Sequence, residues 1–375
     1  MHKSIMLLKF WKNNVLQTFF QRVVLIILNI GTSVFVKGKA TSFDIAYRAG
    51  VSQSTVSRAL RHSPLVSEAT RKKIQEIAKE LNYTVDKNAS SLRSQSSTTL
   101  ALLLFEDPTS DDSLVNPFFL SMLGSITREC GLMGYDLLVS FQELNADWHS
   151  VFKDSNKADG LILLGYGDYL DYETKLKELV EHNTPFVRWG AATESVETTS
   201  IGCDNFHGGQ MATKHLVDLG RKHFGFVGTS NESAPEFMAR FNGFTQALAD
   251  ADIDYDPGLQ ADAVNTAEEG YEATKKLLSE GLPLDAIVVA SDLLATGVIT
   301  ALKDANLRVP EDVAIVGFDD IPMARYTTPA LTTCRQDTMA AGKLLVDKLI
   351  EMIKGEPVSN TFIKTSLIVR ESCGS

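Results

Sequence analysis

Between residues 41 and 81, apolar residues recur at the three- and four-residue spacing of amphipathic helices. Thr41, Ser52 and Ser67 stand directly before three periodic stretches, where a side-chain oxygen can cap the first backbone N–H groups of a helix. Gly50 separates the first two stretches, and glycine ends helices because it adopts the left-handed conformation without a Cβ clash. The pattern predicts three short helices, the first two forming a helix-turn-helix.

The second predicted helix, from about residue 53 to residue 60, has one apolar face and one polar face. Val56, Ala59 and Leu60 fall on the inward side. The outward side carries Gln53, Ser54, Ser57 and Arg58. We therefore expect this helix to pack on a small core and to present its polar side chains to a partner.

The start of the third helix carries hydroxyl and basic side chains. These residues are Thr70, Arg71, Lys72 and Lys73. A helix N-terminus with hydroxyls and cations can hold a phosphate, which would fix a docking position without reading sequence. The alternative is a solvated basic face.

Beyond residue 98, continuous apolar runs alternate with amphipathic helical stretches. The runs occupy residues 99–105, 135–141, 160–166, 185–189, 223–228, 286–291 and 313–318. Buried runs that alternate with helices are typical of parallel sheets covered on both faces. Such sheets bind ligands beyond the carboxyl ends of their strands. We therefore expect an α/β core with a pocket at the strand ends.

The distribution of charge divides the chain at the same place. The formal net charge of the chain is −11, yet residues 37–97 hold eleven Lys and Arg against five Asp and Glu. This asymmetry indicates a basic, DNA-directed module joined to an acidic body, although chance clustering on a solvated helix would give the same counts. With 375 residues, 44% of them hydrophobic, the chain is long enough for two or three domains.

Motifs of catalysis and metal binding are missing from the sequence. The four cysteines form no C-x-x-C pair and have no histidine at ligand spacing, which argues against a zinc site or a disulfide framework and favours a reducing cytoplasm. The sequence also contains no G-x-S-x-G elbow, H-E-x-x-H pair or phosphate-binding P-loop. We therefore expect a binding protein without catalytic residues, metal or cofactor.

Residues 1–39 form an N-terminal extension that fits neither main part. Its apolar run at 23–36 is shorter than the roughly 20 residues that a membrane span needs. A cleaved signal peptide would carry the basic module out of the cytoplasm. We favour a natural start at Val34 or Val36 and expect no membrane association.

The run TSFDIAYRAGVSQSTVSRALRHSPLVSEATRKKIQEIAKELNY, residues 41–83, closely resembles the DNA-binding headpiece of LacI/GalR-type bacterial transcription regulators. The resemblance implies that the second helix enters the major groove, with Gln53, Ser54 and Arg58 reading bases. Glutamine can pair bidentately with adenine and arginine with guanine, which agrees with that role. The other expected DNA contacts of the headpiece are Thr41, Thr55, Ser57, Arg61, Ser67 and Thr70.

The polar segment at 85–97 resembles the hinge of the same family. The resemblance implies a short helix that forms on operator DNA, with Leu92 wedged between base pairs in the minor groove and Ala89 beneath it. Many relatives have proline where Val85 and Lys87 stand and arginine where Ser90 stands. The hinge of this chain departs from the family pattern at these three positions.

The remainder of the chain resembles the core of the same family, a periplasmic-binding-protein type I fold. Its landmarks are NPFF (116–119), CDNFHGG (203–209), RFNGF (240–244), ASDLLATG (290–297), LRVPEDVAIVGFDD (307–320) and TPALTTCRQD (328–337). The resemblance implies two Rossmann-like subdomains with three crossovers and a cleft between them.

We divide the chain by this resemblance into four parts. They are the extension at 1–39, an all-α headpiece at 40–84, the hinge at 85–97 and an effector-binding and dimerisation core at 98–375. Within the core, we assign about 98–202 and 309–337 to the first subdomain. The second subdomain then takes about 203–308 and 338–375.

The resemblance also implies effector ligands in the core. Asp292 and Arg240 are the leading pair, since a carboxylate and a guanidinium suit the hydroxyls of a sugar. Asp292 could instead cap the helix that follows it, and Arg240 could be a surface salt-bridge partner. Glu236 belongs to the same expected set.

Aromatic residues complete the expected effector site. Phe118 and Phe119 match positions that pack against the effector, although core packing is an equal alternative. Arg188 and Trp189 end a strand, while Asn265 stands where relatives often have an aromatic residue. We therefore hypothesise that the stacking surface has moved to Trp189.

These features predict a homodimeric, cytoplasmic and nucleoid-associated regulator. It is expected to repress carbohydrate-utilisation genes at a pseudo-palindromic operator under the control of a sugar-type effector. One alternative is a sugar-binding receptor of a transport system, anchored by the apolar N-terminus. Another is an enzyme of sugar metabolism with a fused headpiece.

Overall fold

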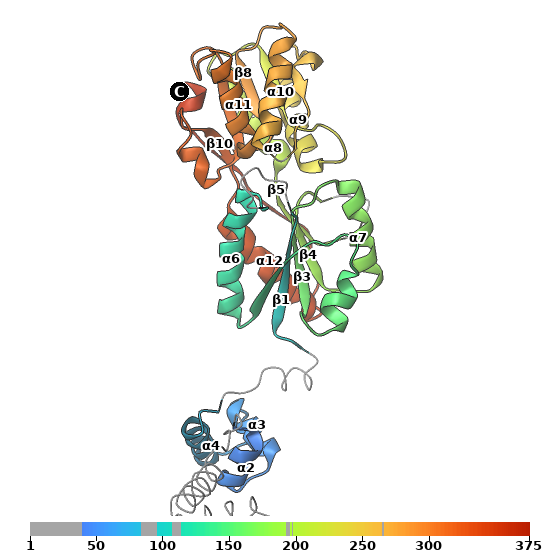
Figure 1. Ribbon diagram of the computed structural model, residues 1–375, viewed down its shortest axis with the longest axis vertical. Coiled ribbons are helices and arrows are strands. Elements are labelled where there is room, and N and C mark those ends of the chain that lie inside the picture. The colour runs from blue at the N-terminus through green and yellow to red at the C-terminus, as the bar shows by residue number, and fades with distance from the viewer. Residues whose placement is uncertain (1–39, 84–95, 107–113, 193–195, 197, 265) are drawn as a thin grey trace, which may run out of the picture. The chain divides into compact units, whose positions relative to one another are not determined.

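A computed structural model describes residues 40–83, 96–106, 114–192, 196, 198–264 and 266–375. The chain divides into two compact units, Met1–Ser90 and Ser91–Ser375. We call the described residues 40–83 the headpiece and the described residues from 96 onward the core (Figure 1). The expectations for the N-terminal extension, for Ala89 and Leu92 of the hinge and for Asn265 lie outside the described residues.

The headpiece consists of the three helices that the polar and apolar pattern predicts. They are α2 (Ser42–Ala49), α3 (Gln53–Leu60) and α4 (Glu68–Glu80). Thr41 and Asp44 form a reciprocal capping box, and Ser52 and Ser67 cap the other two helices through their hydroxyls. The left-handed Gly50, with φ of 70°, ends α2.

A small apolar core joins the three helices. Ile45 from α2, Val56 and Ala59 from α3 and Ile74 from α4 are each fully buried. Val51 packs against this core from the glycine turn. The packing fixes α3 with its polar side chains turned outward, because its buried positions all lie on the opposite face.

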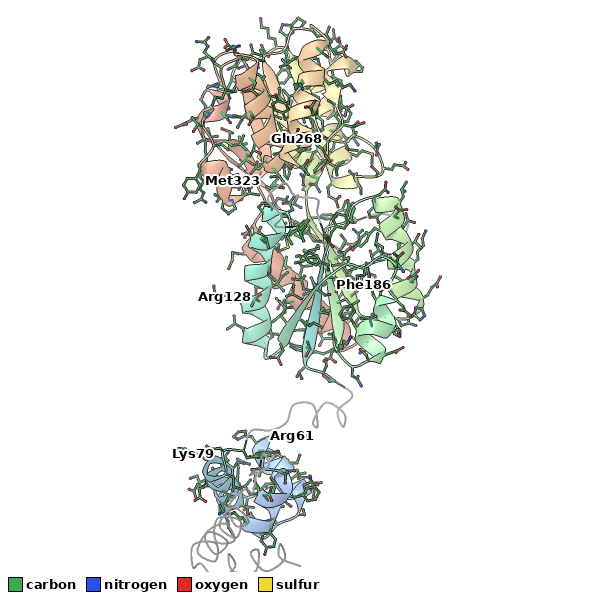
Figure 2. The ribbon with its side chains drawn as sticks, in the orientation of Figure 1. Arg61, Lys79, Arg128, Phe186, Glu268 and Met323 are labelled. Atoms are coloured by element: carbon green, nitrogen blue, oxygen red, sulfur yellow. The ribbon has the colours of Figure 1, made fainter. Side chains whose placement is uncertain are left out.

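The first sheet of the core has six parallel strands in the order β11-β5-β4-β3-β1-β2. Their bounds are β1 Thr99–Leu104, β2 Asp136–Phe141, β3 Gly160–Leu164, β4 Phe186–Trp189, β5 Ser200–Cys203 and β11 Thr361–Ile363. Helices α6 (Pro117–Met133) and α12 (Thr338–Ile353) pack together at one face, and α7 (Tyr169–Glu181) and the short helix His149–Asp154 pack at the other. The buried side chain of Phe186 and the exposed side chain of Arg128 on α6 mark the inner and outer layers (Figure 2).

The second sheet has the order β12-β10-β9-β8-β6-β7, and only β12 runs antiparallel to its neighbour among these described strands. Its strands are β6 Phe224–Val227, β7 Gln260–Ala261, β8 Ala286–Val289, β9 Ala314–Asp319, β10 Thr332–Arg335 and β12 Ser366–Ile368. The helices of this subdomain are α8 Asn205–Asp218, α9 Pro235–Asp250, α10 Ala267–Ser279 and α11 Asp292–Asp304. α8 packs on α9, and α10 packs on α11.

The chain passes between the two sheets three times, as the resemblance implies. The crossovers lie between β5 and α8, between β10 and α12 and between β11 and β12. Our assignment of the later segments to subdomains was wrong. Residues 309–337 supply β9 and β10 to the second sheet, whereas 338–363 supply α12 and β11 to the first. An apolar run shows that a strand exists, but its sheet depends on hydrogen-bond partners that the run does not specify.

All seven apolar runs form strands at or within two residues of the expected bounds. In the described part of the chain, five further strands escaped prediction because they are short, at two to four residues, or polar. β10 shows the second cause, since Thr332 and Thr333 are fully buried although their side chains are polar. Among the described residues, no helix has the length and apolar character needed to cross a membrane.

Candidate operator-reading face and effector cleft

The outward face of α3 holds the residues expected to read DNA, and several of them contact one another. Gln53 donates from Nε2 to the Ser42 hydroxyl on α2 at 2.8 Å, which fixes its amide against the first helix. Arg61 donates to the Ser57 hydroxyl at 3.0 Å. Arg58 is exposed to solvent near the C-terminal end of α3. The face therefore combines the Gln53 amide, which Ser42 holds in place, with the solvent-accessible guanidinium of Arg58.

Hydroxyl groups cluster at the N-terminus of α3. The Ser52 hydroxyl lies 2.8 Å from the hydroxyls of both Ser54 and Thr55, and it also accepts the backbone N–H of Thr55 at 3.2 Å. The contact with Thr55 satisfies one of the first backbone N–H donors of the helix. Ser54 is exposed and lies one residue after Gln53, at the end of α3 that is expected to enter the groove.

Two of the basic residues at the start of α4 bind within the headpiece. Arg71 donates to the carbonyl oxygens of Ser63 at 3.0 Å and Val66 at 3.2 Å and pairs with Glu68 at 2.9 Å. Lys73 donates to the Ala49 carbonyl oxygen at the end of α2, at 3.0 Å. These two cations hold neighbouring segments of the headpiece together. Neither the phosphate site nor the solvated basic face expected from the sequence therefore describes them fully.

A cleft opens between the two subdomains of the core, with a volume of about 690 Å³ including its mouth. The first subdomain contributes Asn116, Phe118, Phe119, Gly165, Tyr166, Gly167 and Trp189 to its lining. The second subdomain and its crossover contribute Ala234, Glu236, Phe237, Arg240, Val264, Ser291, Asp319 and Gln336. A ligand in this cleft would touch both subdomains at once.

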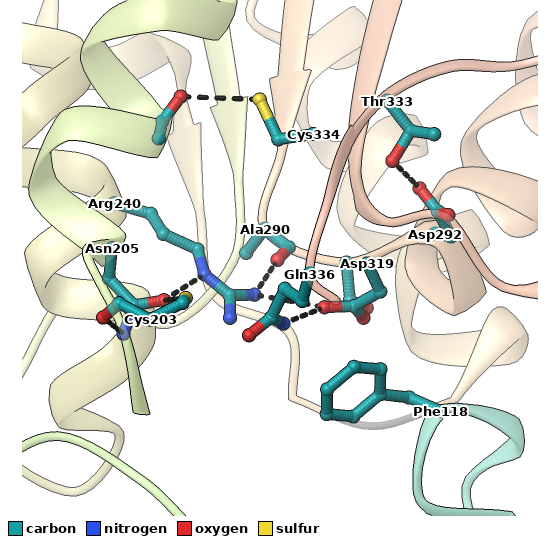
Figure 3. A network of polar contacts seen from close by, with 12 residues as sticks. Phe118, Cys203, Asn205, Arg240, Ala290, Asp292, Asp319, Thr333, Cys334 and Gln336 are labelled. Atoms are coloured by element: carbon teal, nitrogen blue, oxygen red, sulfur yellow. Dashed lines mark hydrogen bonds and ion pairs between the residues drawn. The ribbon is translucent and has the colours of Figure 1, made fainter. Parts of the chain in front are cut away.

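Arg240 is the centre of a buried polar network at the inner end of the cleft (Figure 3). Its Nε donates to Asn205 Oδ1 at 2.8 Å, and a second guanidinium nitrogen donates to the Ala290 carbonyl oxygen. The same group lies 3.8 Å from an Asp319 carboxylate oxygen. The guanidinium carbon stacks 3.7 Å from the centroid of the Phe318 ring. Because Arg240 is only 5% exposed, the surface salt-bridge alternative for this residue is wrong.

Asp319 lies at the carboxyl end of β9 in an unusual backbone conformation, with φ of 116°. Its carboxylate accepts a hydrogen bond from the Gln336 amide at 2.6 Å. Burial raises the pKa of Asp319 to about 6, while Arg240 and the Gln336 hydrogen bond act in the opposite direction. The cleft therefore contains a carboxylate that ionises close to neutral pH.

Aromatic rings cover the opposite wall of the cleft. The rings of Phe118 and Trp189 are tilted with centroids 5.9 Å apart, and Phe119 packs edge-on to Phe118 at 5.4 Å. Phe118 is 5% exposed and Trp189 is 7% exposed, so both serve the core and the cleft lining together. Aromatic faces of this kind suit the apolar face of a sugar ring.

Two family models match the sequence of this chain. "Bacterial regulatory proteins, lacI family" matches residues 43–86, and "Periplasmic binding protein-like domain" matches residues 213–373. The transcriptional repressor PurR of Haemophilus influenzae strain PittEE is 30% identical over 345 residues, which cover 90% of this chain and 99% of that protein. The chain belongs to the LacI family of bacterial regulatory proteins.

Other LacI-family proteins are similar over nearly the whole chain. The ribose operon repressor of Escherichia coli K12 is 29% identical, covering 88% of this chain and 98% of that protein. The lac repressor dimer bound to operator and the anti-inducer ONPF has a TM-score of 0.76 at 26% identity and covers 90% of this chain and 99% of that chain. A complex of the regulator CelR with cellobiose has a TM-score of 0.67 at 26% identity, with coverages of 89% and 99%.

Membership of the LacI family confirms the expected fold and function. The chain is a DNA-binding transcriptional repressor controlled by a small ligand, with a helical headpiece and a core of the periplasmic-binding-protein type. Its relatives are repressors and not enzymes. The comparisons do not favour the transport receptor, since that alternative leaves the lacI-type headpiece without a use.

Two residues expected to bind the effector do not line the cleft of this LacI-family core. Asp292 is fully buried and accepts hydrogen bonds from the Thr333 hydroxyl at 2.6 Å and the Ile321 backbone N–H at 3.0 Å. It does not cap α11 either, because Ser291 holds that position. Arg188 is fully buried and donates to the Thr198 hydroxyl at 3.2 Å and the Ala191 carbonyl oxygen at 2.6 Å.

The reason for this correction is the direction of each side chain. A residue at a strand end can point into the cleft or back beneath a neighbouring strand, and the sequence does not distinguish the two. Asp292 points back toward β9 and β10, and burial raises its pKa well above the usual value, with the nearby Asp319 carboxylate as the second cause.

Ten lining residues of the cleft were missed from the sequence, and Tyr166, Ser291, Asp319 and Gln336 are four of them. Tyr166 and Asp319 could have been found, because each stands at or just beyond the carboxyl end of an expected strand. Gln336 had no such signal, since its strand β10 was not predicted. In the headpiece, Ser42 was missed because its contact with Gln53 joins two helices.

Proposed function

We propose that this LacI-family chain works in the cytoplasm as a homodimer on a pseudo-palindromic operator and is released or retained there by a neutral sugar. The observation that carries the proposal is the composition of the cleft, in which aromatic faces stand opposite carboxylates and a buried guanidinium. Sugars combine apolar ring faces with hydroxyls that both donate and accept hydrogen bonds. The cellobiose complex of CelR and the name of the ribose operon repressor support this class of effector.

In this proposal, α3 reads the operator. Gln53, Ser54 and Arg58 contact base edges, and the bidentate pairings open to Gln and Arg each discriminate by about 1–3 kcal/mol. Hydroxyls and cations around them contact phosphates and fix the docking position. These residues are Thr41, Thr55, Ser57, Arg61, Ser67 and Thr70. Leu92 and Ala89 keep their proposed minor-groove role on the resemblance alone.

The proposed effector site is the cleft lining. Phe118, Phe119 and Trp189 supply the ring contacts from the first subdomain. Glu236, Arg240 and Asp319 supply polar contacts from the second subdomain. We remove Asp292 and Arg188 from the direct contacts, because hydrogen bonds within the protein occupy both side chains.

The proposed control is a shift between two arrangements of the subdomains. An effector changes operator affinity only if it binds one arrangement more tightly than the other. The cleft meets this requirement because its contacts come from both subdomains, so their separation changes when the subdomains move.

Gel-shift binding to the DNA beside the protein's own gene, combined with a thermal-shift screen against neutral sugars, tests the proposal. We expect binding to a pseudo-palindromic site and a stabilisation of about 2.7 kcal/mol for a sugar at 100 times its dissociation constant. The same sugar must change the gel-shift affinity. If the protein binds a sugar tightly but does not bind DNA, the result would favour the transport receptor instead.

A further inference from the structure

The side chain of Glu236 joins the two subdomains across the effector cleft. It stands in the first turn of α9 in the second subdomain, yet one oxygen accepts the backbone N–H of Ala191 at 2.6 Å in the first. The other oxygen accepts the hydroxyl of Tyr166, just beyond β3. A backbone hydrogen bond from Tyr169 to the Ser233 carbonyl oxygen, at 3.1 Å, joins the same two segments. This end of the cleft is therefore closed by an acceptor that faces donors.

The described cleft lining carries two carboxylates, Glu236 and Asp319, and one cation, Arg240. Arg240 is the one cation among those lining residues, and it already contacts Asp319, Asn205 and the Ala290 carbonyl oxygen. Glu236 is a second carboxylate, one turn before Arg240 on α9. Burial raises its pKa, and hydrogen bonding to Ala191 and the charge of Arg240 act in the opposite direction. A ligand that reaches Glu236 meets a surface rich in hydrogen-bond acceptors.

Arg188 is a further cation beside Gly190, close to Glu236. It is fully buried and does not belong to the lining. Its guanidinium donates to the carbonyl oxygen of Ala191 at 2.6 Å, the same residue whose N–H binds Glu236. Arg188 therefore positions the loop that holds Glu236, and the cleft lining itself presents the Glu236 carboxylate and not this guanidinium.

We propose that Glu236, oriented by Tyr166 and Ala191, makes the cleft select an uncharged effector that presents a hydrogen-bond donor and reject phosphorylated or carboxylated ones. This inference rests on the proposed function of the cleft as an effector site. A carboxylate oxygen has lone pairs for more than one donor, so a sugar hydroxyl can join or replace the Tyr166 hydroxyl. A phosphate group brings negative charge without a donor, and repulsion is strong where water is excluded.

Calorimetric titration of the full chain with matched pairs tests the proposal. The pairs are D-ribose with D-ribose 5-phosphate and D-glucose with D-glucose 6-phosphate, with cellobiose as a further neutral probe. We expect at least one neutral sugar to bind, and its phosphorylated counterpart to bind at least tenfold more weakly. The Glu236→Gln variant should reduce that preference at least tenfold, because it removes the charge while keeping the size and one acceptor oxygen.

A matched control separates local from general charge effects. Glu232→Gln removes the same charge from an exposed position four residues earlier and should leave the preference unchanged. Phosphorylated sugars that bind the wild type as tightly as neutral ones would overturn the proposal, and so would an unchanged preference in Glu236→Gln. If phosphorylated sugars bind and operator binding is intact, the repressor function still holds. If no sugar binds, both this inference and the proposal of a sugar effector are overturned.

Discussion

Replacing Asp319 by asparagine should change the stability of the core in a pH-dependent way. The side chain is 7% exposed, and burial raises its pKa from 3.8 to about 6 in the folded protein. The folded state therefore binds a proton between these two values that the unfolded state releases. Stability from this group is fully present below the unfolded pKa and is lost as pH rises through the folded pKa.

The size of the effect follows from the size of the pKa shift. A rise from 3.8 to about 6 corresponds to about 3 kcal/mol at 1.36 kcal/mol for each pH unit. Asparagine keeps the size of the side chain and does not ionise, so it does not carry this pH-dependent loss. The free energy of unfolding of Asp319→Asn minus that of the wild type should therefore rise by about 3 kcal/mol between pH 4 and pH 7. The substitution also removes the Asp319 charge that raises the pKa of Asp292, which adds to the rise.

Urea unfolding at a series of pH values measures this difference, followed by tryptophan fluorescence to which the buried Trp148 and Trp189 contribute. Asp312→Asn is the matched control, because hydrogen bonds from Arg308 lower the pKa of Asp312 to about 2. Its stability difference should change in the opposite direction and only in acid. A flat or falling difference for Asp319→Asn would refute the reasoning.

Three further substitutions test the headpiece and the buried network. Arg58→Ala should relax base preference at one position of each half-site, by about 1–3 kcal/mol in competition gel shifts, while effector binding stays the same; an unchanged preference would remove Arg58 from the base readers. Ser42→Ala should weaken discrimination at the base that Gln53 reads while the helix content by circular dichroism is retained, since it removes the hydroxyl that holds the amide; equal discrimination would show that the contact does not position Gln53. Thr333→Val should lower the free energy of unfolding by about 1–3 kcal/mol, because Asp292 loses a buried hydrogen bond; chemical denaturation with no loss would contradict that.

Local structure could be predicted from the sequence wherever a few adjacent residues decide it. The caps at Thr41, Ser52 and Ser67 are examples, since a hydroxyl before a periodic stretch is enough to begin a helix. The buried strands of the core are another example, because their apolar runs are continuous. By contrast, β10 is buried with two threonines whose hydroxyls bond to Asp292 and to the C-terminal segment. No local pattern reveals a polar strand whose partners lie elsewhere in the chain.

The candidate site was predicted less completely, for a related reason. Arg240 lies in the second turn of α9 and Asp292 is the first residue of α11, yet the first side chain lines the cleft and the second lies beneath β9 and β10. That choice depends on which neighbours satisfy each carboxylate or guanidinium once the sheets have formed. Asp319 shows the same limit, because Gln336 reaches it only through the pairing of β10 with β9.

The two walls of the cleft make Trp189 a test of how the effector controls DNA binding. A ligand that has equal affinity for both subdomain arrangements shifts nothing, however tightly it binds. Contacts on the aromatic wall matter for control only if they differ between the arrangements. Because Trp189 stands at the end of β4 and faces a lining contributed by the second subdomain, its contact with a shared ligand should change when the subdomains move.

Trp189→Ala should therefore reduce the effect of a saturating sugar on operator affinity, and a higher sugar concentration should not restore it. Operator affinity without sugar should stay at the wild-type value, because the substitution lies outside the headpiece. Gel shifts at rising sugar concentration separate the two possible losses. A plateau below the wild-type response means lost coupling. The full wild-type response at higher sugar concentration would show that Trp189 contributes equally in both arrangements and would contradict its proposed role.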